Sequence, residues 1–309
     1  MKLWSRWVSM LSEREPATVL ALFRIACGLC AIATVGSVVY ADIVELVWLD
    51  SQWGGYRKLA HGPWLVELLG GVSPRMTWTL VCVSLVSSVL LTLGVGGRIT
   101  ALVALWSVMG ATDLNGQAGG SYDELLTCGM WLLVLGPSTA TLSVDCRLSR
   151  GVWHSPEASS YAWLRWLGVF QIMLAYWSTG MQKLSAYWTP VGGFSALYYI
   201  LQQPSWHRWD MEWIAPAYPL LQVMTATTWL WELTSPLLLL AFWYRRHPRP
   251  GWRSKFGHYR TIFVLFGLLT HIGIWILMEV GPFTWVTLTF YICMFSPREV
   301  QNLWSRIRT

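Results

Sequence analysis

The chain has 309 residues, of which 54% are hydrophobic and only 12% charged, whereas a soluble domain carries about 25% charged residues. This composition and the mean hydropathy of +0.43 argue against a soluble protein and predict an all-α polytopic membrane protein. The net charge of +6 comes from basic residues spread among short loops. Because no basic stretch is interleaved with aromatic residues, we expect no nucleic-acid partner.

Eight apolar stretches predict eight transmembrane helices, since such helices need about 20 mainly apolar residues. The first opens after Pro16, and the fourth follows the polar, Gly-rich stretch 115–121 and ends at Gly136 and Pro137. The expected spans lie at about residues 18–40, 75–95, 98–113, 122–137, 161–184, 220–243, 258–279 and 282–296.

The basic residues predict the orientation of these spans. With eight spans, 17 of the 22 lysines and arginines fall on the side of the termini, and five fall on the other side. By the positive-inside rule, we expect a multi-pass protein of the cell membrane with both termini cytoplasmic. The loop YRRHPRPGWRSK before the seventh span would also suit anionic membrane lipid, although orientation alone explains its charge.

The segment 185–219, which follows the fifth span, has the character of a short re-entrant or interfacial segment. Pro190 breaks the helix, and Gly192 and Gly193 let backbones approach closely. The apolar run 194–201 is only about two helical turns long. At membrane depth such a segment must be buried in protein or line a cavity.

Lys183 stands just before this segment and is the only lysine between Lys58 and Lys255. A lone ammonium in the outer half of the membrane is costly, so we expect it to have a role or a partner. A helix break, small residues, aromatic walls and one amine together suit a pocket for a lipid-like or quinone-like ligand. The candidate lining residues are Trp177, Trp188, Gly192, Gly193, Tyr198 and Tyr199.

Three further residues within the expected spans are candidates for a structural or functional role. Arg24 and Glu232 are the obvious structural ion pair, since each is costly alone. His271 is expected at a depth similar to that of Lys183, where it either contacts a ligand or only hydrogen-bonds a neighbouring helix. The scattered histidines and cysteines have no metal-ligand spacing, so we expect no metal.

A series of segments, in order, resembles the HTTM membrane domain that is shared with vitamin K-dependent gamma-carboxylase. The segments are Phe23-Arg24-Ile25, Gly119-Gly120, TGMQKLSAYW, GGFSALYYIL, TWLWELTSPLLLL and LTHIGIWILMEVGPFT. The resemblance covers about residues 15–297. It implies a single HTTM-like domain over residues 1–309, similar in size to stand-alone bacterial members found in the inner membrane.

The resemblance also implies a chemistry. In the carboxylase a lysine within K-L-D-x-x-W deprotonates reduced vitamin K, and Lys183, with Leu184 and Trp188, falls on that position. His271 falls on a family histidine. The implied catalytic pair is therefore Lys183 as base, assisted by His271, with a reduced quinone such as menaquinol as cosubstrate. The implied product is a modified or matured secreted peptide.

The sequence departs from that of the carboxylase at two positions, and two other hypotheses for the function stay open. Gly120 stands where the carboxylase has a histidine, and Ser185 replaces the acid after K-L, so we do not expect glutamate carboxylation itself. One alternative is a non-enzymatic peptide- or lipid-binding protein, such as a toxin-maturation accessory or transport component, with Lys183 as anchor. The other is a structural subunit in which Lys183 snorkels.

Overall fold

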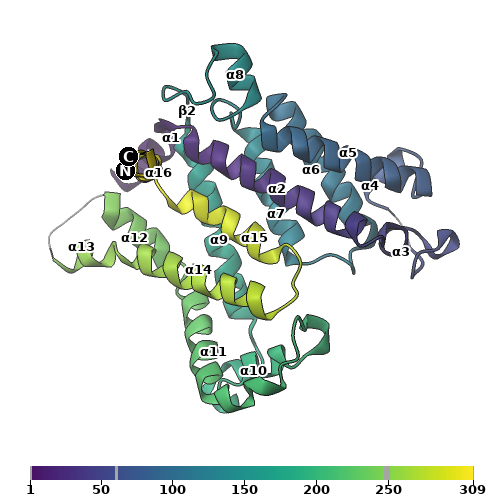
Figure 1. The fold of residues 1–309 in the computed structure, drawn as a ribbon. Coiled ribbons are helices and arrows are strands. Elements are labelled where there is room, and N and C mark those ends of the chain that lie inside the picture. The colour runs from purple at the N-terminus through teal and green to yellow at the C-terminus, as the bar shows by residue number, and fades with distance from the viewer. Residues whose placement is uncertain (1, 60–61, 247–250, 309) are drawn as a thin grey trace. The chain divides into compact units, whose positions relative to one another are not determined.

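The computed structural model describes residues 2–59, 62–246 and 251–308 (Figure 1). This part of the chain is mostly helical, and its only named strands are β1 (Arg14–Pro16) and β2 (Ser159–Tyr161), which pair antiparallel. Within it, three helical stretches are long and apolar enough to cross a membrane: α2 (Thr18–Tyr40), α5 (Pro74–Leu93) and Trp252–Leu277. The last comprises α13 (Trp252–Phe256) and α14 (Tyr259–Leu277).

The chain divides into two compact units, each described by itself. The first holds residues 1–169 and 285–309, and the second holds residues 170–284. Helix α9 (Ala162–Gln182) begins in the first unit and ends in the second. Residues 247–250, in the middle of the basic loop YRRHPRPGWRSK, lie outside the described residues.

The first unit contains a bundle of α2, α5, α6 (Gly97–Thr112) and α7 (Ser121–Leu135) (Figure 1). Small residues allow close packing: a Cβ built on Gly28 of α2 would lie 2.2 Å from the hydroxyl of Thr92 on α5. Gly94 and Gly96 adopt φ of +74° and +77° and so permit the tight turn between α5 and α6. Successive helices of this bundle therefore run antiparallel.

The shorter elements outside this bundle lie within the first unit or at its border with the second. They are α1 (Lys2–Ser12), α3 (Val44–Trp48), α4 (Trp64–Leu68), α8 (Val144–Arg150), α15 (Phe283–Tyr291), α16 (Pro297–Arg308) and 3-10 turns at Ser51–Trp53, Asp113–Asn115 and Ile292–Met294.

The second unit is built from the end of α9, α10 (Ala196–Leu201), α11 (Tyr218–Leu233), α12 (Leu237–Arg246), α13 and α14. Its core joins the short helices to the end of α14, with Leu201, Met211, Ile214, Leu221 and Met278 all buried. The segment after α9 is a series of short pieces, as expected. Besides α10 it contains 3-10 turns at Ala186–Trp188, Pro190–Gly192, Pro204–Trp206 and Glu212–Ala217.

Helices occupy every stretch that was predicted to span the membrane, but two stretches differ in form. The predicted sixth span, 220–243, is wrong as a single helix, because α11 ends at Leu233 and α12 begins at Leu237. Pro236, which lacks an N–H donor, stands in the break. The eighth stretch holds only the nine-residue α15 and a 3-10 turn.

Candidate functional site

Lys183 lies immediately after α9 and forms a salt bridge with Glu232 of α11. Its Nζ donates a hydrogen bond to Oε2 of that carboxylate. The side chains are mostly buried, with 17% of Lys183 and 11% of Glu232 exposed. The ammonium of Lys183, largely removed from water, thus meets a carboxylate, which can both neutralise its charge and accept its proton.

The close approach of α9 and α11 brings these two residues together. A Cβ on Gly180 would lie 3.0 Å from Cβ of Glu232 and 3.1 Å from the backbone nitrogen of Leu233. Two hydrogen bonds fix the crossing: Trp229 Nε1 donates to the carbonyl of Gly180 at 3.1 Å, and Ser235 Oγ to that of Met173 at 3.0 Å. The small residue at position 180 therefore places Glu232 against Lys183.

The predicted pairing of Arg24 with Glu232 is wrong. Arg24 is fully buried, with 0% exposed, and its guanidinium is held by main-chain carbonyls. Nη1 donates to Ser138 O at 2.7 Å, and Nη2 donates to Leu142 O at 2.6 Å. These carbonyls belong to the loop between α7 and α8. Both Nη groups of Arg24 thereby have acceptors within the first unit, while the carboxylate of Glu232 pairs with Lys183.

Among the residues predicted to line a ligand site, Trp188 contacts Lys183. The 3-10 turn Ala186–Trp188 folds back after α9, so that Nζ of Lys183 lies 4.7 Å from the centre of the Trp188 ring. This is a cation–π distance. The aromatic face stabilises the ammonium beside the carboxylate of Glu232.

The other five predicted residues have different surroundings, and among them Gly192 and Tyr199 contact this turn. Gly192 packs on the backbone of Ala186, where a Cβ would lie 2.5 Å from the carbonyl carbon. Gly193 adopts φ +66°, and its carbonyl accepts a 2.6 Å hydrogen bond from Gln222, so both glycines have structural reasons to be glycine. The aromatic members behave differently: Trp177 is partly exposed on α9, while Tyr198 and Tyr199 of α10 lie in an aromatic group with Tyr187 and Tyr218.

His271 belongs to a second polar pair and hydrogen-bonds a neighbouring helix, one of the two roles expected for it, although its partner Tyr176 was not predicted. Its Nε2 lies 2.7 Å from the hydroxyl of Tyr176, and both residues are buried. Thr284 Oγ1 donates to the carbonyl of His271 at 3.2 Å. Tyr176 precedes Lys183 by seven residues, or two helical turns, which separates their backbones by about 10 Å. The structure thus places Lys183 and His271 in two different pairs.

Trp231 links the two pairs. It is the neighbour of Glu232 on α11, and its ring centre lies 4.4 Å from that of Tyr176. It also stacks on Phe263 of α14 at 4.8 Å and donates from Nε1 to the carbonyl of Phe263. This aromatic wall fixes α9, α11 and α14 to one another around the polar groups.

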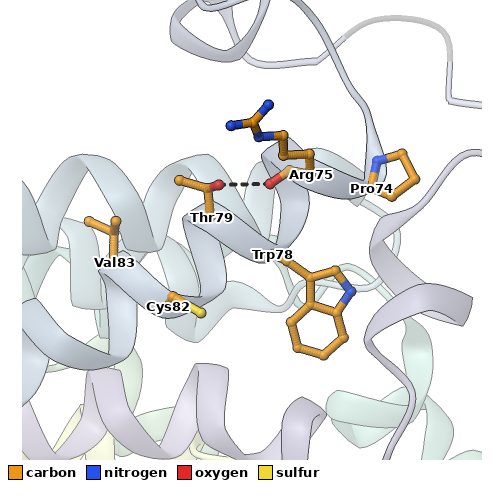
Figure 2. A pocket seen from close by; sticks show the side chains of 6 residues that line it. All are labelled: Pro74, Arg75, Trp78, Thr79, Cys82 and Val83. Atoms are coloured by element: carbon orange, nitrogen blue, oxygen red, sulfur yellow. Dashed lines mark hydrogen bonds between the residues drawn. The ribbon is translucent and has the colours of Figure 1, made fainter.

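A shallow hollow lies elsewhere, on one face of α5 in the first unit (Figure 2). It has a volume of about 490 Å³ and is lined by Pro74, Arg75, Trp78, Thr79, Cys82 and Val83. The hydroxyl of Thr79 is used within the helix, donating to Arg75 O at 2.7 Å, and the guanidinium of Arg75 points away from the Trp78 indole. The polar groups do not converge as they do in a small-molecule site.

Among the described residues, no group of three His, Cys, Asp or Glu side chains is placed to hold a metal ion. No protein-family model, curated protein or solved structure matches the chain. The case for a functional site therefore rests on the geometry around Lys183, and the HTTM resemblance stays a prediction.

Proposed function

We propose that this protein is a multi-pass membrane protein in which Lys183 and Glu232 accept a proton from a weakly acidic, lipid-like cosubstrate such as a reduced quinone. One observation carries the proposal: Lys183 is mostly buried, paired with a carboxylate and placed on an aromatic face. A partner that can take the proton lets the amine alternate between charged and neutral forms, which a base requires.

The surface beside the pair suits a lipophilic molecule. Leu184, Tyr187, Val191 and Tyr199 are all exposed, and the rings of Tyr187 and Tyr199 lie 4.9 Å apart. Exposed apolar residues next to one charged pair favour a ligand with a large apolar body and one polar group. A quinol or a lipid has this form, whereas a polar metabolite does not.

The proposed reaction begins with proton transfer within the pair, from the ammonium of Lys183 to the carboxylate of Glu232. The neutral amine then takes the proton of one quinol hydroxyl and leaves a quinolate anion. Dioxygen takes two electrons and the remaining hydroxyl proton from the quinolate, and it takes a second proton from the ammonium. The products are quinone and hydrogen peroxide. Coupling to the maturation of a secreted peptide is proposed on the HTTM resemblance alone.

The proposed orientation, with cytoplasmic termini, is supported by the charges of the first unit. Contacts of Glu15 with Arg165 and of Arg165 with the carbonyl of Cys293 gather β1, the start of α9 and the 3-10 turn Ile292–Met294 at one end. That end also carries Arg147 and Arg150 of α8. The loop and helix starts at the other end carry fewer basic residues, namely Arg57, Lys58 and Arg75. Such a bias is typical of a cytoplasmic face.

A second candidate function is favoured by the ion pair itself. In the structure Lys183 donates to a carboxylate, so the same ammonium could exchange Glu232 for the carboxylate or phosphate of a ligand. The protein would then bind a peptide or an anionic lipid without catalysis, as a maturation accessory or transport component. In that case an arginine at position 183 would serve nearly as well, because it also presents a cation.

The proposal is tested by ligand capture with a photoreactive menaquinone analogue on the purified protein in lipid nanodiscs. We expect a covalent adduct within 183–199, competed by unlabelled menaquinone and reduced by Trp188→Ala. Val223→Ala serves as the matched control, because Val223 is an exposed residue of α11. Labelling spread over all apolar helices, or unaffected by competitor, would contradict a quinone site here.

A further inference from the structure

Helix α1 (Lys2–Ser12) is amphipathic, and its apolar face is only partly covered by the protein. Trp4, Trp7, Val8 and Leu11 recur at intervals of three and four residues and so share one face. Trp4 is 76% exposed and Val8 is 46% exposed, whereas Met10, at one edge of this face, is buried. The opposite face carries Ser5, Arg6, Ser9 and Ser12.

The connection to α2 keeps α1 close to the membrane that α2 is suited to cross. Ala17 donates from its backbone nitrogen to Ala158 O at 2.9 Å, and Glu15 pairs with Arg165 at 2.9 Å. Five residues separate the end of α1 at Ser12 from the start of α2 at Thr18, a reach of at most about 20 Å. The exposed tryptophan face is therefore held near the boundary where α2 begins.

We propose that α1 lies in the head-group layer of an anionic phospholipid leaflet, at the end of the bundle where α2 begins. Trp4 and Val8 would enter the acyl boundary, and Arg6 would face the lipid phosphates. Three features favour this occupant over a second protein surface. A tryptophan suits the boundary of a bilayer; the helix carries basic residues, Lys2 and Arg6, and no acid; and such helices bind anionic lipid surfaces.

The test places a photoreactive p-benzoylphenylalanine at Trp4 or Val8 in the full chain, reconstituted in vesicles of phosphatidylglycerol and phosphatidylethanolamine. The matched control carries the same group at Ser9, on the polar face of α1. After irradiation we expect several-fold more lipid adduct from positions 4 and 8 than from position 9. Positions 4, 8 and 9 are all exposed, so we expect the substitution to leave the fold intact at each of them. Equal thermal unfolding midpoints of the three variants would verify this.

Three results would overturn the proposal: equal lipid adducts at all three positions, no lipid adduct at positions 4 and 8, or adducts to a second copy of the chain in place of lipid. The proposed contact of Arg6 with anionic lipid phosphates is tested separately. Arg6→Gln should lower the preference of the adduct for phosphatidylglycerol over phosphatidylcholine vesicles, by up to about fivefold, the effect of one basic residue near an anionic surface. An unchanged preference would contradict that charge contact.

Discussion

Arg24 and Lys183 are both cations within predicted spans, but the chain holds them in opposite ways. Arg24 is fully buried among main-chain carbonyls, none of which can take a proton. Lys183 retains some exposure and meets the carboxylate of Glu232. A guanidinium among carbonyls stays charged and serves as a fixed brace. A lysine amine, unlike a guanidinium, can lose its proton, so the second arrangement is the one for which we propose chemistry.

The largest expected loss of stability follows the replacement of Arg24, the fixed brace. Arg24→Met leaves the carbonyls of Ser138 and Leu142 without their donors, which we expect to cost about 3 kcal/mol or more. At about 2 °C per kcal/mol, the thermal midpoint should fall by about 6 °C or more. Arg24→Lys should recover little of this loss, because one ammonium lacks the fork geometry. Thermal unfolding of the purified protein in detergent measures both. A midpoint within 1 °C of the wild type, at the scale of one small surface effect, would refute the bracing role.

A smaller effect is expected at the helix crossing that creates the Lys183 site. Gly180→Ala forces a methyl group against Glu232 and Leu233, an overpacking that costs about 1–3 kcal/mol. Gly273→Ala in α14 is the matched control, because a Cβ there meets nothing within 4 Å. It should be neutral or stabilising by up to about 1 kcal/mol. If both variants unfold alike, the close contact at Gly180 does not position Glu232.

Stability should be nearly unaffected when both members of the Lys183 pair are replaced together. Lys183→Met alone leaves the carboxylate of Glu232 buried without its partner, so we expect this variant to lower the free energy of unfolding. The double variant Lys183→Met, Glu232→Leu removes both charges and should unfold within about 1 kcal/mol of the wild type. A double-mutant cycle on unfolding free energies tests this. If the double variant is as unstable as Arg24→Met, the pair is a structural brace as well.

The smallest effect concerns a carboxylate held by backbone groups, the reverse of the Arg24 arrangement. Asp50 accepts from the backbone nitrogens of Gln52 at 2.9 Å and Leu59 at 2.6 Å, and these bonds lower its pKa from the ordinary 3.8. The ionised carboxylate of Asp50 therefore stabilises the segment 50–59 at neutral pH, and this stabilisation is lost as the pH falls through the lowered pKa. Protease cleavage within 50–59 should rise only in strong acid, while Asp50→Ala is cleaved already at pH 7. Equal cleavage of both at pH 7 would contradict this role.

The helices were largely predictable because apolar runs end at strong signals. Gly94 and Gly96 mark the turn after α5, and Gly136 and Pro137 follow the end of α7 at Leu135. The break between α11 and α12 was also signalled, by Pro236, but the apolar residues around it favoured one long span. Helix positions thus follow from local sequence, whereas the number of membrane crossings needs more than these signals.

The partners of the polar groups were less predictable. The acceptors of Arg24 are main-chain carbonyls, which carry no signal in the side-chain sequence. The match of Lys183 with Glu232 depends on the α9–α11 crossing at Gly180, which brings together residues 49 positions apart. Tyr176 could have been considered, since it stands in the same predicted span, 161–184, as Lys183. Its partner His271 required the tertiary fold.

The most direct measurement of the proposed chemistry is the oxygen-dependent oxidation of reduced menaquinone by the reconstituted protein. We compare the wild type with Lys183→Ala and Lys183→Arg. If the amine is the base, both variants lose the protein-dependent rate while retaining quinone binding, because a guanidinium does not give up its proton. A rate that survives in Lys183→Arg would contradict base catalysis and would favour the role of Lys183 as an anchor for anionic ligands.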